Sequence, residues 1–168
     1  SAEAYVKRAC VDIIGRTDTI SHEPMDVVIY GFGRIGRLAT RLLIEKTGGG
    51  QNLVPRAVVL RPPKDPILDL NRRASLLRRD SIHGGFKGTI RVDEENHVLV
   101  CNGNVIHFIY AADPSSIDYT QYGIKNALVI DSSGVWRDEA GLSQHLKSPG
   151  VAKVLLTTAG KGSIKNIV

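Results

Sequence analysis

The sequence predicts an α/β fold in which a mostly parallel sheet is covered by helices on both faces. Short apolar runs alternate with helical patterns along the 168 residues, and this alternation is typical of parallel sheets. A glycine-rich segment joins the first apolar run to a helical pattern. Asn102-Gly103 lies between two β-rich runs, which is the strongest short signal for a hairpin. We therefore expect a doubly wound sheet with an inserted β-hairpin and an N-terminal helical extension.

The first half of the chain reads as this extension followed by a strand–helix–strand unit. Apolar residues recur at approximate helical spacing over residues 1–20. Beyond Pro24, residues 27–30 and 57–60 predict two buried strands. The helix between them should end at the glycines 48–50. Its inner face is expected to consist of Ile35, Leu38, Ala39, Leu42 and Leu43.

The second half continues the alternation around the hairpin. Two further helices are expected, the first with Leu70, Ala74 and Leu77 facing inward and the second with Leu142 and Leu146. The expected elements are a helix at 69–78, strands at 88–92, 97–101, 105–110 and 127–130, a helix at 138–147 and a strand at 151–156.

Composition and charge fit a globular domain with acidic partners. The chain is 42% hydrophobic and 23% charged, with a net charge of +5, which is ordinary apart from the basic excess. No apolar run approaches the roughly 20 residues that span a bilayer, and two cysteines without metal-type spacing favour a reducing cytoplasm. One short stretch is either a solvated basic surface or a phosphate-binding rim. It contains Arg56, Arg61, Lys64, Arg72, Arg73, Arg78 and Arg79.

The glycines of Gly31-Phe32-Gly33-Arg34-Ile35-Gly36 have the spacing of a dinucleotide-binding loop. The first allows a tight turn, the second lets the backbone approach a pyrophosphate, and the third lets helix and strand pack closely. The helix N-terminus adds unpaired N–H groups and a partial positive charge. Because the loop lies between a predicted strand and a predicted helix, it indicates a Rossmann-type domain rather than a structural turn.

Several motifs, in order, resemble the NAD-binding domain of glyceraldehyde-3-phosphate dehydrogenases. The string that runs from Gly31 to Arg37 is highly specific to that family, and the resemblance covers residues 27–168. The other similar segments are Asp80-Ser81-Ile82-His83-Gly84, Gly88-Thr89, Asn102-Gly103, Asp113-Pro114, Ser132-Ser133-Gly134-Val135-Trp136 and Val154-Leu155-Leu156-Thr157.

The resemblance implies the cofactor-binding domain of a phosphorylating glyceraldehyde-3-phosphate dehydrogenase, a glycolytic oxidoreductase that passes hydride from an aldehyde to NAD or NADP. Residues 26–168 would be a C-terminally truncated Rossmann domain, and residues 1–25 the extension of a longer bacterial subgroup. The family's catalytic cysteine and histidine lie beyond the last strand, so this chain alone is expected to be inactive. We expect a cytoplasmic homo-oligomer for the full-length protein, with no membrane contact.

Two other functions remain open. Erythrose 4-phosphate is an alternative substrate within the same enzyme class, because the substrate domain that would discriminate is absent. A non-catalytic nucleotide- or RNA-binding module is the alternative from a different class. The aromatic content of 5% offers no evident stacking platform for single strands, so a nucleic-acid partner is not favoured.

The resemblance also implies which residues hold the cofactor. The backbone N–H groups of Arg34 and Ile35 would bind the pyrophosphate. The main chain at Ala112, the Ser133-Gly134 turn and Thr157 would line the adenosine and nicotinamide halves. The full expected set is Gly31, Phe32, Gly33, Arg34, Ile35, Gly36, Arg61, Ala112, Ser133, Gly134 and Thr157.

The sequence departs from the family's pattern in three places. Leu60 and Arg61 stand where an Asn-Asp pair accepts hydrogen bonds from the adenosine ribose. An arginine there favours a 2′-phosphate, so Arg61 either indicates use of NADP or points to solvent and leaves specificity lax. Ala112 replaces an arginine near the adenine, and Tyr30 replaces an asparagine before the glycine loop. The pocket must therefore be shaped differently.

No residue of the chain is assigned a catalytic or metal-binding role. Cys101 in the hairpin and Cys10 in the extension are expected to be structural. His97 and His107 lie on adjoining strands, where paired surface residues are favoured over a cross-strand metal site. His145 has no recognisable partner in the sequence.

Overall fold

The computed structural model describes residues 2–9, 24–47 and 52–167. A seven-stranded sheet crosses the domain in the order β5-β6-β7-β2-β1-β8-β9. The strands are β1 (Met25–Tyr30), β2 (Leu53–Leu60), β5 (Ile90–Asp93), β6 (Val98–Cys101), β7 (Asn104–Tyr110), β8 (Ala127–Asp131) and β9 (Val151–Leu156), and a separate short pair consists of β3 (Arg79–Asp80) and β4 (Gly84–Gly85). The helices are α1 (Ala2–Ala9), α2 (Arg34–Thr47), α3 (Pro66–Arg78) and α4 (Glu139–Leu146), with single 3-10 turns η1 (Pro114–Ser116) and η2 (Tyr119–Tyr122).

Strand pairing confirms the predicted fold class. β1 pairs in parallel with β2 and with β8, β2 pairs in parallel with β7, and β8 with β9. β6 pairs antiparallel with both β5 and β7, and the predicted Asn102-Gly103 turn joins β6 to β7. The domain is therefore an α/β Rossmann-type fold with an inserted hairpin. β3 and β4 were not expected, since a two-residue strand leaves no periodic signal.

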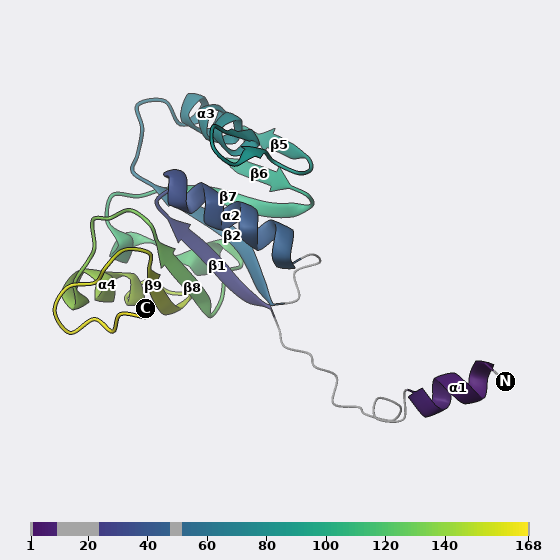
Figure 1. Cartoon of the computed structure of the whole chain (residues 1–168). Coiled ribbons are helices and arrows are strands. Elements are labelled where there is room, and N and C mark those ends of the chain that lie inside the picture. The colour runs from purple at the N-terminus through teal and green to yellow at the C-terminus, as the bar shows by residue number, and fades with distance from the viewer. Residues whose placement is uncertain (1, 10–23, 48–51, 168) are drawn as a thin grey trace.

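The sheet is buried on both faces in its centre, because successive strand residues point to opposite sides. Val27 and Ile29 of β1 belong to one core cluster, together with side chains of α2 and α3. Val28 and Tyr30 belong to the other, together with the segment that carries η2. Figure 1 shows α2 and α3 on one side of the sheet and α4 beside β8 and β9. The parallel strands β1, β2 and β8 thus form the rigid centre of the domain.

The start of α3 is fixed by its first residues. Asp65 caps the helix by accepting a hydrogen bond from the Leu68 N–H at 3.0 Å, and Pro66 occupies the first helical position, where its missing N–H costs nothing. Leu70, Ala74 and Leu77 are fully buried, which confirms the predicted inner face of this helix.

Two predicted inner faces were partly wrong. Ile35 and Leu42 of α2 are 52% and 55% exposed, because the helix turns Gly36, Thr40 and Ile44 toward the sheet instead. Close packing at Gly36 determines this rotation, as its contacts show below. On α4, Leu142 is buried as expected, but Leu146 is 52% exposed.

The N-terminal extension is helical over Ala2–Ala9, and the rest of its predicted helix, with Cys10, lies outside the described residues. The boundary between extension and domain stays a prediction. None of the helices in the described ranges is long and apolar enough to cross a membrane.

Candidate cofactor site

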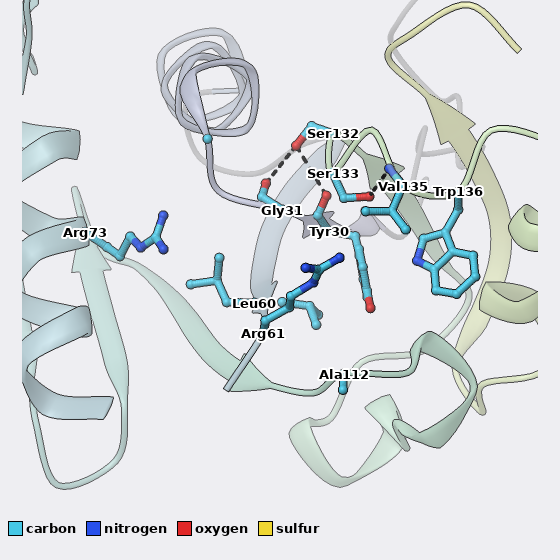
Figure 2. A pocket seen from close by; sticks show the side chains of 12 residues that line it. Tyr30, Gly31, Leu60, Arg61, Arg73, Ala112, Ser132, Ser133, Val135 and Trp136 are labelled. Carbon is cyan, nitrogen blue, oxygen red and sulfur yellow. Dashed lines mark hydrogen bonds between the residues drawn. The ribbon is translucent and has the colours of Figure 1, made fainter. Parts of the chain in front are cut away.

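A cavity of about 420 Å³ opens at the carboxyl ends of the parallel strands. The crossover after β1 leads to β2 on one side, and the crossover after β8 leads to β9 on the other. Open α/β sheets bind ligands in the crevice where the connections diverge in this way. Figure 2 shows its side chains converging from several loops. The lining residues are Tyr30, Gly31, Gly33, Val59, Leu60, Arg61, Arg73, Ala112, Ser132, Ser133, Val135 and Trp136.

One side of this pocket is the glycine wall, residues 31–36, which turns from β1 into α2. Gly31 has a φ of +91°, and a Cβ there would lie 2.9 Å from the Ser133 nitrogen. A Cβ on Gly36 would lie 2.2 Å from the Gly31 carbonyl oxygen. Both positions exclude any other residue, because the atoms in the way are backbone.

Gly33 has a different role from its neighbours. Nothing lies within 4 Å of the position that its Cβ would take, so the loop itself does not require a glycine there. The space in front of Gly33 is open to the pocket that it lines. A ligand can therefore reach the backbone at this point more closely than any side chain would allow.

The glycine wall is also a positively charged end of a helix. Within the described ranges, the backbone N–H groups of Arg34 and Ile35 have no hydrogen-bond partner. The first turn of α2 contains no acidic residue. The guanidinium groups of Arg37 and Arg73 both donate to the Phe32 carbonyl oxygen, at 3.4 Å and 3.2 Å.

The positive charge at this loop is partly balanced by Asp69, which pairs with Arg73 at 3.1 Å. Burial lowers the pKa of Arg37, and the nearby Arg73 and Arg34 lower it further, while Asp80 opposes the effect. Cations at a helix N-terminus add to the positive end of the helix dipole. Unpaired N–H groups at a helix N-terminus are suited to a phosphate group.

Next to the glycine wall is the serine wall, residues 131–136, which begins at the last residue of β8. The Asp131 Oδ1 atom accepts hydrogen bonds from the backbone N–H and the hydroxyl of Ser133, both at 2.7 Å. The Ser132 hydroxyl donates to the Gly31 carbonyl oxygen at 2.7 Å. These hydrogen bonds fix the conformation of the serine wall and connect it to the glycine wall at the carboxyl end of β1.

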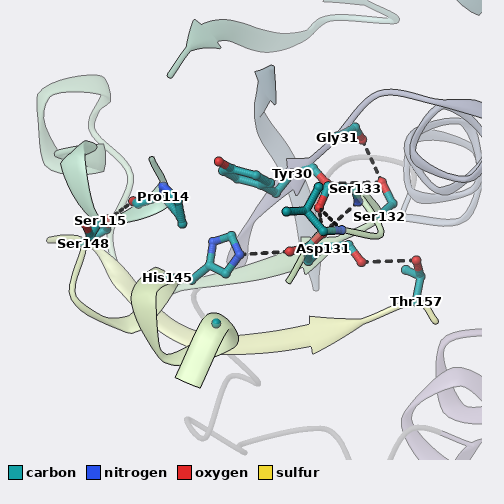
Figure 3. A network of polar contacts seen from close by, with 12 residues as sticks. Tyr30, Gly31, Pro114, Ser115, Asp131, Ser132, Ser133, His145, Ser148 and Thr157 are labelled. Atoms are coloured by element: carbon teal, nitrogen blue, oxygen red, sulfur yellow. Dashed lines mark hydrogen bonds and ion pairs between the residues drawn. The ribbon is translucent and has the colours of Figure 1, made fainter. Parts of the chain in front are cut away.

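Asp131 also joins the serine wall to two more distant elements (Figure 3). Its Oδ2 atom lies 3.0 Å from Nε2 of His145 on α4, and both side chains are almost completely buried. The backbone N–H and the hydroxyl of Thr157, just after β9, donate to the Asp131 carbonyl oxygen at 3.0 and 3.1 Å. The edge of the Tyr30 ring packs on His145, with centroids 4.6 Å apart. Sequence reasoning missed this network, because the partners are 14 and 26 residues away and leave no local signal.

Two aromatic side chains, Tyr30 and Trp136, also line the pocket. The pKa of the Tyr30 hydroxyl is raised, mainly by burial and also by the charges of Asp131 and Asp113. A hydrogen bond from Trp136 and the charge of Arg61 oppose this shift. In Figure 2 the Tyr30 side chain lies between Arg61 and Trp136 and extends toward Ala112. The pocket is thus polar and positive on one side and aromatic on the other.

Comparison with known proteins identifies the family of this domain. The sequence profile of the glyceraldehyde 3-phosphate dehydrogenase NAD binding domain matches residues 25–139. The chain belongs to this family. A glyceraldehyde-3-phosphate dehydrogenase-like protein of Pseudomonas aeruginosa is 59% identical over 168 residues, which is 100% of this chain and 36% of the relative.

Relatives of lower sequence identity carry the same family name. A glyceraldehyde-3-phosphate dehydrogenase of Ajellomyces capsulatus is 39% identical over 131 residues, 78% of this chain and 35% of the relative. Glyceraldehyde-3-phosphate dehydrogenase 2 of Drosophila melanogaster is 39% identical over 129 residues, 77% of this chain and 34% of the relative. The chain spans about a third of the length of these curated relatives. It is the NAD(P)-binding domain of a protein of this oxidoreductase family.

The pocket fits a dinucleotide of the NAD type at the glycine wall. The open space at Gly33 and the free N–H groups of Arg34 and Ile35 are suited to a pyrophosphate. Of the residues predicted for the family's cofactor site, five line the pocket: Gly31, Gly33, Arg61, Ala112 and Ser133.

The other predicted residues lie around the pocket or away from it. Phe32 is 1% exposed and packs on Phe108 in the core, so its side chain supports the loop from behind. Gly36 is buried, and Gly134, with a φ of +72°, turns the serine wall. Thr157 lines a second, larger hollow of about 1100 Å³ between α4, β9 and residues 158–167. The predicted set of site residues did not include the lining residues Tyr30, Val59, Leu60, Arg73, Ser132, Val135 and Trp136. Tyr30, Leu60 and the segment 132–136 had been singled out from the sequence only as departures from the family or as a similar segment.

The basic stretch that the sequence singled out is divided between several roles. Arg73 pairs with Asp69 at 3.1 Å and lines the pocket. Arg56 lies 3.6 Å from Asp26, and Arg78 donates to the Ile90 carbonyl oxygen at 3.0 Å. Neither a purely solvated face nor a continuous phosphate rim describes it.

The cysteine and histidine predictions concern residues outside the pocket. Cys101 is fully buried, and burial raises its thiol pKa to about 12. His97 packs on Tyr110 and His107 on Tyr122. Across the described part of the chain, no group of three or more His, Cys, Asp or Glu side chains could hold a metal ion.

Proposed function

We propose that this domain holds NAD or NADP with its pyrophosphate at the glycine wall and its adenosine beside Arg61 and Ala112. The nicotinamide would then extend past the serine wall toward Thr157. The observation that carries this proposal is the open approach to Gly33 in front of two unpaired helix N–H groups. The 11 residues predicted from the family pattern, Thr157 included, form the proposed site.

For the whole protein, we propose phosphorylating oxidation of glyceraldehyde 3-phosphate. The bound nicotinamide would accept a hydride from the aldehyde. The names and similarity of the relatives support this reaction, and erythrose 4-phosphate remains the alternative substrate. We also propose that the protein acts in the cytoplasm as a homo-oligomer, with residues 1–25 as an extension and residues 26–168 as the cofactor domain.

The 168-residue chain alone is expected to bind the cofactor without catalysing the reaction. An aldehyde-oxidising cysteine must be a thiolate to attack its substrate. Cys101 is buried in the hairpin with its pKa raised to about 12, so its thiol is neutral at physiological pH. Reduction of NAD or NADP by the purified chain, given glyceraldehyde 3-phosphate and inorganic phosphate, would contradict this expectation.

Calorimetric titration of the purified chain with NAD and NADP, at low and high salt, tests the proposed binding. Saturable one-to-one binding with a weak salt dependence is the expected result. A nucleic-acid-binding module would instead bind RNA with an affinity that falls steeply with salt. Absence of saturable binding for both dinucleotides would contradict the proposal.

A further inference from the structure

We propose that this domain prefers NADP because Arg61 binds the phosphate on the 2′ position of the adenosine ribose. The inference rests on the proposed binding of a dinucleotide in the pocket. It concerns the one feature that distinguishes NADP from NAD, a phosphomonoester at the 2′ oxygen.

The position of Arg61 in the sheet is the first argument. It directly follows Leu60, the last residue of β2, and the ribose of a bound dinucleotide lies over the end of this strand in Rossmann-type folds. The strand end is fixed on both sides, because Tyr30 of β1 pairs with Val59 and the Ala111 N–H donates to the Leu60 carbonyl oxygen at 2.8 Å. Arg61 therefore projects from a rigid base into the pocket that it lines.

The second argument is that Arg61 is free to bind. Its guanidinium makes no hydrogen bond or ion pair with any residue in the described ranges, and it is exposed. Arg73, the other arginine of the pocket, is already held by Asp69 and by the Phe32 carbonyl oxygen. Arg61 is thus the lining arginine whose donors remain available for a ligand, and guanidinium donors match the geometry of phosphate oxygens.

The third argument is the absence of a competing carboxylate among the lining residues. A carboxylate at the end of β2 would accept hydrogen bonds from a free 2′-hydroxyl and would repel a 2′-phosphate. Two carboxylates that act on the lining residue Tyr30 are engaged elsewhere. Asp131 holds Ser133 and His145, and Asp113 accepts the backbone N–H and hydroxyl of Ser115, both at 2.9 Å.

The positive charges in the pocket lie where NADP would place its phosphate groups. NADP carries the pyrophosphate and a 2′-phosphate, whereas NAD carries the pyrophosphate alone. Arg34, Arg37 and Arg73 surround the glycine wall, where the pyrophosphate would bind. Arg61 adds a separate positive charge at the ribose. NADP carries an anion for both places, whereas NAD carries one only for the glycine wall.

The test is a set of calorimetric titrations of the 168-residue chain and two variants. NADP and NAD are compared, and so are 2′,5′-ADP and 5′-AMP, which isolate the 2′-phosphate from the nicotinamide half. The variants are Arg61→Asp and Arg72→Asp. Arg72 is exposed, lies on α3 and is not among the lining residues, so its substitution makes the same change in charge away from the pocket.

We expect the unmodified chain to bind NADP at least about tenfold more tightly than NAD, as one charged hydrogen bond predicts. Arg61→Asp should abolish or invert this ratio while NAD binding persists, and Arg72→Asp should preserve the ratio. Equal binding of NAD and NADP by the unmodified chain would overturn the role of Arg61 and leave the proposed function intact. An equal loss of the NADP preference in both variants would also overturn it, since the overall positive charge of the domain would then be the cause. Failure to bind either dinucleotide would overturn the proposed function itself, and this inference with it.

Discussion

The glycine wall and the serine wall lie side by side in one pocket, but they hold their shapes by opposite means. Gly31 and Gly36 allow backbone atoms to approach where any Cβ would collide. The serine wall depends on what side chains supply, because Asp131, Ser132 and Ser133 bind one another and the neighbouring backbone. Substitutions that add atoms should therefore destabilise the glycine wall, and substitutions that remove atoms should destabilise the serine wall.

The largest effect is expected for Gly36→Ala. The new Cβ would meet the Gly31 carbonyl oxygen at 2.2 Å and the Ser132 hydroxyl at 2.9 Å, and a backbone oxygen cannot rotate away. We expect a loss of about 3 kcal/mol in the free energy of unfolding, at the upper end for overpacked cores. Denaturant unfolding followed by circular dichroism measures it. An unchanged midpoint would show that α2 can shift freely on the sheet.

Removing the Asp131 carboxylate should destabilise the serine wall, in this case because side-chain atoms are lost and not added. Asp131→Ala leaves buried Nε2 of His145 and the Ser133 N–H without their acceptor. Buried groups that lose a partner cost about 1–3 kcal/mol each. Because the Ser133 N–H is only partly buried, we expect a loss near the lower end for two groups, about 2 kcal/mol, together with weaker dinucleotide binding.

A double variant sharpens this second prediction. Asp131→Ala with His145→Leu removes both partners, and replacing a pair by apolar groups costs less than orphaning one member. The double variant should therefore be more stable than the sum of its single variants predicts. Strictly additive losses would mean that the contact between Asp131 and His145 contributes no coupling.

The same contrast explains what the sequence could and could not predict. Glycine spacing between a strand and a helix carries the geometry of the glycine wall, so Gly31, Gly33 and Gly36 were predicted from their pattern. The phase of α2 was wrong because its buried stripe contains Gly36, Thr40 and the aliphatic Ile44, and apolar periodicity does not count a glycine or a threonine as inward.

The serine wall was predicted only in part for a related reason. Family resemblance pointed to Ser133 and Gly134, but the partner that fixes Asp131 is a histidine from another helix, buried to 1% exposure. A lone histidine on a helix gives no indication of a buried acceptor. Long-range polar pairs of this kind become visible only when the strands are placed beside each other.

Gly33→Ala should separate binding from folding on the glycine wall. No atom lies within 4 Å of the new methyl group, and the backbone at Gly33 is not in the left-handed region. Stability should stay the same or rise by about 0.5 kcal/mol, because alanine restricts the unfolded chain. Affinity for NAD or NADP should fall about tenfold, because the methyl group would stand where the pyrophosphate approaches.

The comparison with Gly36→Ala is the control for that experiment. Both variants add one methyl group to the same loop, and only Gly36→Ala meets backbone atoms. Titration calorimetry and unfolding on both proteins should give opposite profiles, one losing affinity with stability retained and the other losing stability. Unaltered binding in Gly33→Ala would contradict the placement of the pyrophosphate.

The smallest expected effect is a pH dependence behind the glycine wall. The Asp80 Oδ1 atom accepts hydrogen bonds from the backbone N–H groups of Ile82 and His83 and contacts the His83 ring, each at 3.0 Å. These hydrogen bonds, those from His83 first, hold the pKa of Asp80 well below its usual range. Arg41 of α2 donates to the Gly84 carbonyl oxygen in the same loop, so loosening of the loop reaches the helix.

The sign of the effect follows from the lowered pKa. A carboxylate whose folded pKa lies below the unfolded value of about 3.9 stabilises the protein above that value. Its contribution is lost as the pH falls through the folded pKa. Asp80→Asn should therefore be less stable than the unmodified chain at neutral pH, and the difference should shrink below about pH 4. Unfolding curves at neutral and acid pH measure this, and a difference that stayed constant with pH would mean that Asp80 acts through shape and not through its charge.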